Sequence, residues 1–309
     1  MKRILSPALL LLAAIIWGLA FSAQKSAEAV PPFTLGAARS FIAGAFLIIV
    51  IIIFDKLLNT GRRLFSKEKK IDLNRAELLG GVICGIILAA ASFFQQAGMA
   101  AGADAGKASF ITALYVVLVP IYALALKKKA GINVWISVVI AAVGFYLLCI
   151  EGAFAVARED LIVMVCSLIF PFHILAIDHF SPKCDGIRMS CVQFFVCAAV
   201  NLILALITEM PIAVEAIKDN ILSLVYLGIM SSGVAYTLQI IGQKGTPPAA
   251  ASVILSLESV FGVIGSAIIL GETMKPREYI GAGVVFIAVI ISQLDMDALL
   301  KKKQKRSGF

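Results

Sequence analysis

The chain has 309 residues, of which 61% are hydrophobic and only 15% are charged, and its mean hydropathy is +0.98. Soluble domains average about 45–50% apolar and about 25% charged residues, so this composition excludes an ordinary water-soluble protein. The formal net charge of +8 does not indicate nucleic-acid binding, because the Lys and Arg residues stand in short clusters between apolar runs.

Ten apolar runs follow one another along the chain, each near the length of about 20 residues that an α-helix needs to cross a bilayer. They predict an all-α integral membrane protein, with the lipid bilayer as its solvent and spans at residues 4–24, 34–54, 77–99, 108–126, 133–150, 160–178, 189–208, 221–241, 249–270 and 278–294. The connections are short, so neighbouring helices are expected to be antiparallel.

The basic residues predict how these spans are oriented. If the N-terminus is placed inside, 20 of the 27 Lys and Arg residues fall on the inner side, including a basic tail after the last span. Cytoplasmic loops are enriched in Lys and Arg. The sequence therefore predicts a multi-pass protein of the cell membrane with both termini in the cytoplasm.

Self-comparison indicates two related halves. The segment at 108–117 aligns with 251–260 at an offset of 143, with Leu114 matching Leu257 and Val117 matching Val260. Five spans in each half make the second copy enter from the opposite side of the membrane. We expect two inverted five-helix repeats, at residues 1–152 and, with the basic C-terminal tail, at 153–309.

Several motifs make the chain resemble a known family over nearly its whole length. They are Trp17-Gly18 with Phe21, Pro31-Pro32 and Arg39 in the first half, then 106–110 through Val119-Pro120, and in the second half 247–251 through 270–272, with Gly281 and Gly283. This pattern resembles the EamA family of the drug/metabolite transporter superfamily. The resemblance implies ten helices around a central cavity and the transport of amino acids, other metabolites or drugs, without fixing the substrate.

The chain also departs from that family pattern. Many members end the fourth span with a Gly-Glu pair, whereas Lys127-Lys128 stand near that point here. Many carry a proline in the middle of the ninth span, where this chain has Glu258 nearby.

Glu258 is the clearest candidate for a site residue, because an ionisable side chain at mid-bilayer costs at least about 2.5–3.5 kcal/mol on insertion scales. It stands about nine residues into its span, near the midplane. It is either a site for a substrate amine or a proton, or a structural glutamate of the bundle. The repeat alignment gives Tyr115 the equivalent place in the first half, so we expect both at one cavity. A basic partner for Glu258 would be sought first at Lys107 or Arg39.

Other polar or aromatic side chains within the spans are further candidates for substrate binding, each with a structural alternative. His173, two residues after Pro171, either relays protons or holds a helix contact. Trp17 either forms a cavity wall or packs against lipid or a neighbouring helix. The side chains that either hold a polar solute or join helices by hydrogen bonds are Gln95, Gln96, Tyr236 and Gln239.

Lys25 and Arg39 lie nearer the outer end of their spans. Their long side chains either snorkel to the interface or form an anion-attracting vestibule. Asp178 and His179, near an inner end, are expected to be solvated. Glycine pairs such as Gly80-Gly81 suit close helix packing.

Neither a cofactor nor a metal is expected. The six cysteines show no CxxC spacing, only two histidines are present, and no phosphate-binding GK[ST] motif supports transport driven by ATP. An intramembrane enzyme would need paired aspartates, a Ser/His pair or an HExxH motif, and none is present, so we expect no catalytic residues.

These features predict a secondary transporter that exports a small metabolite by alternating access. The alternative is a non-transporting membrane subunit, such as a lipid-flippase partner or a sensor. Whether the protein forms a homodimer is left open by the sequence.

Overall fold

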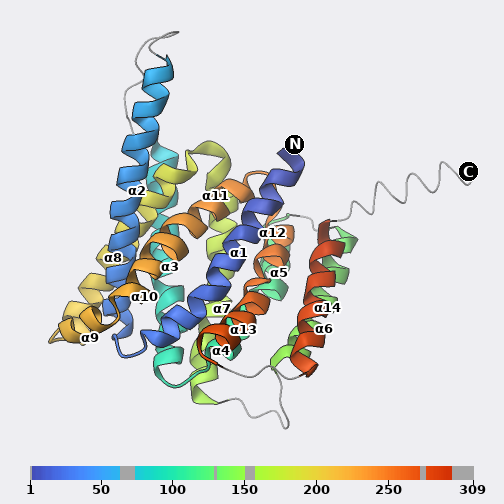
Figure 1. The fold of residues 1–309 in the computed structure, drawn as a ribbon. Coiled ribbons are helices and arrows are strands. Elements are labelled where there is room, and N and C mark those ends of the chain that lie inside the picture. The colour runs from blue at the N-terminus through green and yellow to red at the C-terminus, as the bar shows by residue number, and fades with distance from the viewer. Residues whose placement is uncertain (1, 63–73, 129–130, 150–156, 272–275, 294–309) are drawn as a thin grey trace, which may run out of the picture.

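The computed structural model describes residues 2–62, 74–128, 131–149, 157–271 and 276–293. Within these ranges every regular element is a helix (Figure 1). The α-helices are α1 (Lys2–Ser26), α2 (Pro32–Arg62), α3 (Arg75–Ala100), α4 (Ala105–Ala113), α5 (Tyr115–Ala125), α6 (Ile132–Cys149), α7 (Arg158–Phe180), α8 (Gly186–Thr208), α9 (Val214–Asp219), α10 (Ile221–Tyr226), α11 (Thr237–Gln243), α12 (Pro248–Leu255), α13 (Glu258–Ile269) and α14 (Pro276–Gln293). A 3-10 turn, η1 (Ser181–Lys183), follows α7, and the π-helical segment η2 (Leu227–Tyr236) joins α10 to α11.

Eight helical segments of the described chain are long and apolar enough to cross a membrane. They are Leu5–Ser26, Pro32–Asp55, Arg75–Ala100, Ala105–Ala125, Arg158–Lys183, Gly186–Thr208, Ile221–Gln243 and Pro248–Ile269. The fifth and tenth predicted spans fall on α6 and α14, whose apolar stretches Ile132–Gly144 and Tyr279–Ser292 are shorter. The all-helical membrane fold is confirmed, and crossing by all ten stays a prediction.

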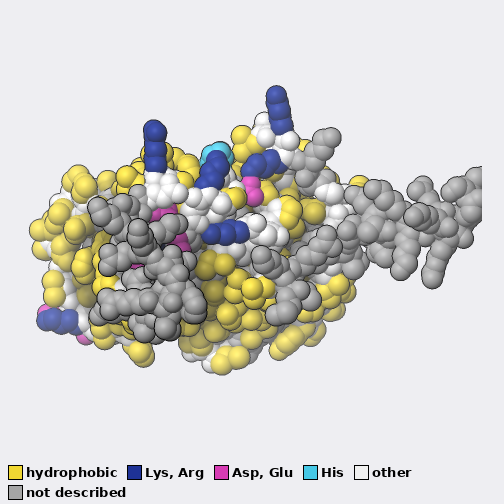
Figure 2. Space-filling model, turned by 90° about the horizontal axis from the view of Figure 1, so that it is seen from above, with side chains coloured by type: hydrophobic (Ala, Val, Ile, Leu, Met, Phe, Trp, Pro, Cys, Tyr) yellow, Lys and Arg dark blue, Asp and Glu magenta, His cyan; other side chains and the backbone are white. Residues whose placement is uncertain are grey.

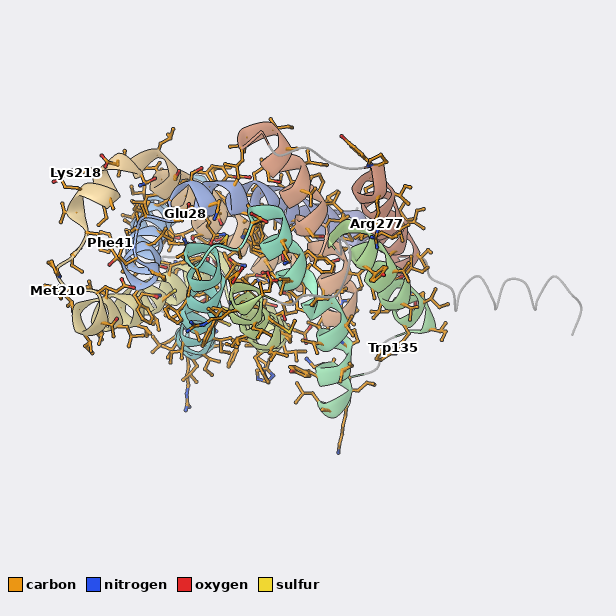
Figure 3. The ribbon with its side chains drawn as sticks, turned by 90° about the horizontal axis from the view of Figure 1, so that it is seen from below. Glu28, Phe41, Trp135, Met210, Lys218 and Arg277 are labelled. Carbon is orange, nitrogen blue, oxygen red and sulfur yellow. The ribbon has the colours of Figure 1, made fainter. Side chains whose placement is uncertain are left out.

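The outside of the bundle is apolar, as a lipid-facing surface requires. Large side chains are strongly exposed there, among them Leu222 at 82%, Ile268 at 77% and Ile207 at 71%. Figure 3 shows Phe41 and Met210 at the periphery. A water-soluble monomer rarely exposes so continuous an apolar belt.

Helices from the two halves of the chain are interleaved. α1 packs against α13, α11 and η2, while α3 packs against α7 and α8. α2 pairs with α8, and α6 pairs with α14 (Figure 1). When the first five predicted spans are exchanged for the last five, the pairings α2–α8 and α6–α14 map onto themselves. Each of the others becomes a different pairing that is also present.

Small residues allow the closest of these approaches. A Cβ atom on Gly18 would lie 2.3 Å from the Cβ atom of Phe261, where α1 crosses α13. A Cβ atom on Gly81 would lie 2.5 Å from that of Val192, where α3 meets α8. The predicted role of Gly80-Gly81 in close helix packing is therefore confirmed.

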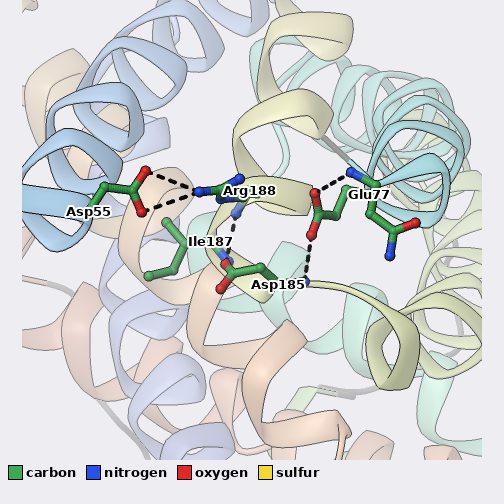
Figure 4. A network of polar contacts seen from close by, with 6 residues as sticks. Asp55, Glu77, Asp185, Ile187 and Arg188 are labelled. Atoms are coloured by element: carbon green, nitrogen blue, oxygen red, sulfur yellow. Dashed lines mark hydrogen bonds and ion pairs between the residues drawn. The ribbon is translucent and has the colours of Figure 1, made fainter. Parts of the chain in front are cut away.

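Polar contacts tie the helices together at the end of the bundle where α1 begins, called here the N-terminal face. Arg188 of α8 donates to both carboxylate oxygens of Asp55 on α2, at 3.2 and 3.0 Å. Glu77 of α3 accepts from the backbone N–H groups of Asn74 and Asp185 at 2.9 and 3.0 Å (Figure 4). Seen from this side, Lys and Arg side chains gather among the described residues (Figure 2). The prediction that Asp178 is simply solvated is wrong, since it forms an ion pair with Lys128.

Candidate functional site

A cavity lies inside the bundle between helices of both halves. Its lining residues are Trp17, Ala20, Phe21, Gln24, Arg39, Gln95, Tyr115, Phe170, His173, Ile174, Ser231, Tyr236, Gln239, Leu255 and Glu258. Seven of the eight candidates for substrate binding are in this set. Gln96 is not, and its Nε2 donates to Gln24 O at 3.4 Å. The structure thus brings the other candidates together, and their role in binding a substrate stays a prediction.

The cavity is small in this conformation. It offers about 30 Å³ to the centres of water molecules, and one water needs roughly 10–15 Å³ on this measure. A few waters fit, but a metabolite does not. Any solute that binds here needs the lining helices to move apart.

Two of the lining residues stand directly after interruptions of their helices. Tyr115 is the first residue of α5, after the break at Leu114, and Glu258 is the first residue of α13, after the break at Ser256 and Leu257. Each is the eleventh residue of its membrane-crossing segment, Ala105–Ala125 or Pro248–Ile269. Both side chains therefore project at mid-depth, as their sequence positions predict.

The backbone tightens at both breaks. The N–H of Leu114 donates to Ile111 O at 3.3 Å, and the N–H of Leu257 donates to Ile254 O at 3.2 Å. These are bonds to the third preceding residue, typical of a 3-10 turn rather than an α-helix. In the second case the hydroxyl of Ser256 donates to Val253 O at 2.8 Å and so competes for a helix carbonyl.

Several buried polar atoms on the cavity wall have no hydrogen-bond partner among the described residues. They are His173 Nδ1 and Gln239 Oε1, and the Tyr115 hydroxyl and Glu258 Oε1 have none other than each other. Tyr115 and Glu258 are electrostatic neighbours. Such atoms are rare in native interiors, because leaving one unpaired costs about 1–3 kcal/mol. Their gathering at one cavity favours a polar solute there.

An aromatic wall closes one side of the cavity. The rings of Trp17 and Tyr236 have centroids 4.5 Å apart, and the Tyr236 ring also meets those of His173 and Phe194 edge-on. Trp17 Nε1 donates to Ser231 O at 3.0 Å, within the π-helical segment η2. A π-helix rotates the residues that follow it relative to a regular helix, and such segments are frequent at functional sites.

Hydrogen bonds hold two further candidates in place. His173 Nε2 lies 3.0 Å from Gln193 Oε1, and Gln95 Nε2 donates to Thr112 Oγ1 at 3.1 Å. Their structural role is therefore plain, and both still line the cavity.

Arg39 is a lining residue that sequence reasoning assigned to the outer interface. Of the two alternatives given for it, snorkelling to the interface is wrong, since Arg39 is only 6% exposed and bonds inside the bundle to Gln24 and Ser232. It lies seven residues into α2, or about 10 Å along the axis. At that depth a long side chain can reach either the interface or the cavity, so the position in the sequence leaves both open. Gln24 and Ser231 were missed as well. Gln24 is the last residue of its predicted span, and Ser231, in the middle of its span, is a small residue of the kind that packs between helices.

The suggested basic partners of Glu258 do not pair with it. Lys107 forms an ion pair with Asp160, and Arg39 has none among the described residues. Lys25 bonds to Glu28 and to Met99 O instead of reaching the cavity. Nor do three His, Cys, Asp or Glu side chains of the described ranges come together as metal ligands would.

A polar cavity at mid-depth between membrane-crossing helices, some of them interrupted, defines the architecture of a membrane transporter. The EamA-like transporter family model matches the chain twice, at residues 5–150 and 157–294. The chain therefore belongs to the EamA-like transporter family.

Individual relatives support this assignment. The chain is 31% identical over 295 residues to an "Uncharacterized transporter" of Archaeoglobus fulgidus, covering 95% of this chain and 87% of that one. It is 24% identical to an "Uncharacterized transporter" of Clostridium kluyveri, covering 82% and 80%. A crystal structure with 18% sequence identity superposes with a TM-score of 0.72, covering 93% of this chain and 96% of that one. The last likeness concerns the fold alone.

Proposed function

We propose that this EamA-family transporter is a secondary transporter that exports a small metabolite, such as an amino acid or related compound or a drug-like solute. The solute binds in the central cavity without covalent chemistry and is released after the two halves rock against each other. The observation that carries the proposal is the placement of Tyr115 and Glu258, one from each half, at equal depth on one cavity wall.

Two features support an inverted repeat as the basis of the rocking motion. The helix pairings are retained when the two halves are exchanged. The interruptions at Leu114 and Leu257 also stand at the repeat offset of 143. Inverted repeats give a transporter two nearly equivalent states, each open to one side.

The small size of the cavity supports the same mechanism. A site with room for a few waters must expand before it binds a metabolite, and the interrupted helices and η2 are where the wall departs from a regular helix. Because the sequence has no nucleotide-binding loop, we propose a gradient as the energy source. Glu258 is the residue we propose to exchange a proton with the cavity.

The test is solute flux in proteoliposomes that contain the purified full chain. Vesicles are loaded with a mixture of isotope-labelled amino acids and other metabolites, and efflux is followed with and without a proton gradient. Protein-dependent efflux of at least one compound is expected. Empty liposomes and the Glu258→Gln variant are the controls. Absence of flux across the panel would favour the non-transporting subunit instead.

A further inference from the structure

Arg39 carries a charge that forms no ion pair within the described part of the chain. Its side chain is 94% buried and lines the cavity. Nε donates to Ser232 Oγ at 3.2 Å and Nη1 donates to Gln24 Oε1 at 3.0 Å. Both partners are neutral, and Nη2 has no hydrogen-bond partner among the described residues.

Burying a cation with only neutral partners is costly, so a charge in such a position is normally paired. Gln24 and Ser232 fix two edges of the planar guanidinium and leave the Nη2 side open. A guanidinium held in this way presents donors in the geometry that suits a planar carboxylate. The arrangement therefore resembles an anion site whose anion comes from outside the chain.

An acidic group, the carboxyl of Glu258, lines the same cavity. Tyr236 is an electrostatic neighbour of both Arg39 and Glu258, and all three line the cavity. The Tyr115 hydroxyl lies beside Glu258. The cavity wall thus carries a cation at Arg39 and an acceptor at Glu258, with Tyr236 close to both.

We infer that Arg39 binds a carboxylate of the transported solute while Glu258 and Tyr115 bind its amino group. The solute is then an amino acid or another small amino-carboxylate, and cationic drug-like compounds are excluded. This inference rests on the proposed function and narrows its substrate class.

Binding to the intact protein tests the inference without requiring flux. The chain has two tryptophans, and Trp17 lines the cavity while Trp135 does not. In a Trp135→Phe background the fluorescence of Trp17 reports occupancy in detergent. The twenty common L-amino acids are titrated first. For the tightest binder, the amide that lacks the carboxylate and the acid that lacks the amino group are then compared with the parent.

We expect the amide to bind about ten- to hundredfold more weakly than the parent, the range that a lost charge-assisted hydrogen bond gives. Arg39→Gln should lower the affinity for the parent amino acid by a similar factor and leave the affinity for the amide unchanged. Arg39→Lys should lower the affinity for the parent by less. Lys25→Gln removes a cation that lies outside the cavity, so its affinity for the parent amino acid should stay within about twofold of that of the unsubstituted protein.

Three outcomes would overturn the inference: no amino acid binds, the amide binds as tightly as the parent, or Arg39→Gln binds the parent unchanged. If Arg39→Gln does not give a monodisperse protein, the test is the affinity of the unsubstituted protein for the parent amino acid compared with its affinity for the amide. Flux separates the two proposals. Efflux of cationic solutes but no carboxylates refutes the inference and leaves transport standing. Carboxylate binding without any flux refutes transport alone.

Discussion

Glu209, at the C-terminal end of α8, holds the start of α2. It accepts from Phe33 N at 2.9 Å, from Thr34 N at 2.7 Å and from Thr34 Oγ1 at 2.8 Å. α2 begins at Pro32, which has no N–H, so Phe33 and Thr34 carry the first two donors that a helix cannot satisfy itself. We predict that Glu209→Ala destabilises the fold substantially, although no cavity-lining atom changes.

The magnitude follows from these three bonds. A hydrogen bond to a charged group is worth about 1.5–3 kcal/mol. Glu209 is only half-buried, so water replaces part of each bond in the variant, and we take about half of the sum. The free energy of unfolding should fall by about 2–4 kcal/mol. Glu209→Gln retains an acceptor oxygen and should lose less.

Thermal unfolding in detergent, followed with a thiol-reactive dye, measures this effect, because Cys84, Cys166 and Cys197 are free and buried and react only on unfolding. Glu215→Ala is the matched control, since that carboxylate is 81% exposed and its one ion-pair partner in the described ranges is Lys218. It should change stability by less than about 0.5 kcal/mol. Equal stability of the Glu209 and Glu215 variants would refute the reasoning.

Three further predictions concern transport, topology and packing. Glu258→Gln keeps the side-chain size and removes the titratable group, so pH-dependent flux should be abolished in a protein that still folds; an unchanged rate and pH profile would assign Glu258 a structural role. A reporter fused after Phe309 should give a cytoplasmic signal, and an external signal would reverse the proposed orientation. Gly18→Ala should cost about 3 kcal/mol, because its Cβ atom would overlap Phe261. Gly283→Ala meets no atom within 4 Å and should be neutral or slightly stabilising in the same unfolding assay.

The helical fold and much of the cavity lining could be predicted from the sequence, because both are marked by long apolar runs and by the few polar residues within them. A run of about 20 apolar residues has few alternatives to a membrane helix. A carboxyl such as Glu258 inside such a run is expensive unless it faces the interior. The offset of 143 then placed Tyr115 at the same depth. These inferences use only position along a helix, which the sequence states directly.

The interruptions and the direction of the Arg39 side chain could not be read in this way. At Leu114 and Leu257 the backbone keeps right-handed helical dihedral angles and only its hydrogen bonds shift, so neither glycine nor proline marks the break. The π-helical turns of η2 likewise leave no compositional signal. Arg39 was placed by distance from a span end, but a long side chain near that end can turn either to the interface or into the bundle. Only its neighbours Gln24 and Ser232 decide between the two.

The pair of α2 and α8 indicates where the proposed rocking motion takes place. Both helices begin at an offset of 154, at Pro32 and Gly186. At the same offset, the contact of Glu209 with Thr34 at one end corresponds to that of Asp55 with Arg188 at the other.

Carboxylates therefore tie α2 to α8 at both ends, one near each face of the membrane. Because one of these helices comes from each half, the two halves stay joined along this pair, and the proposed rocking motion turns about it. The helices that separate to admit a solute are then those that complete the cavity wall, and it is among them that the interruptions and the π-helical segment lie. Within this scheme α2 carries Arg39 on the fixed side of the site, and α13 carries Glu258 on the side that moves. A solute bound between the two charges would thus bridge the fixed and moving parts, which couples its binding to the motion that releases it.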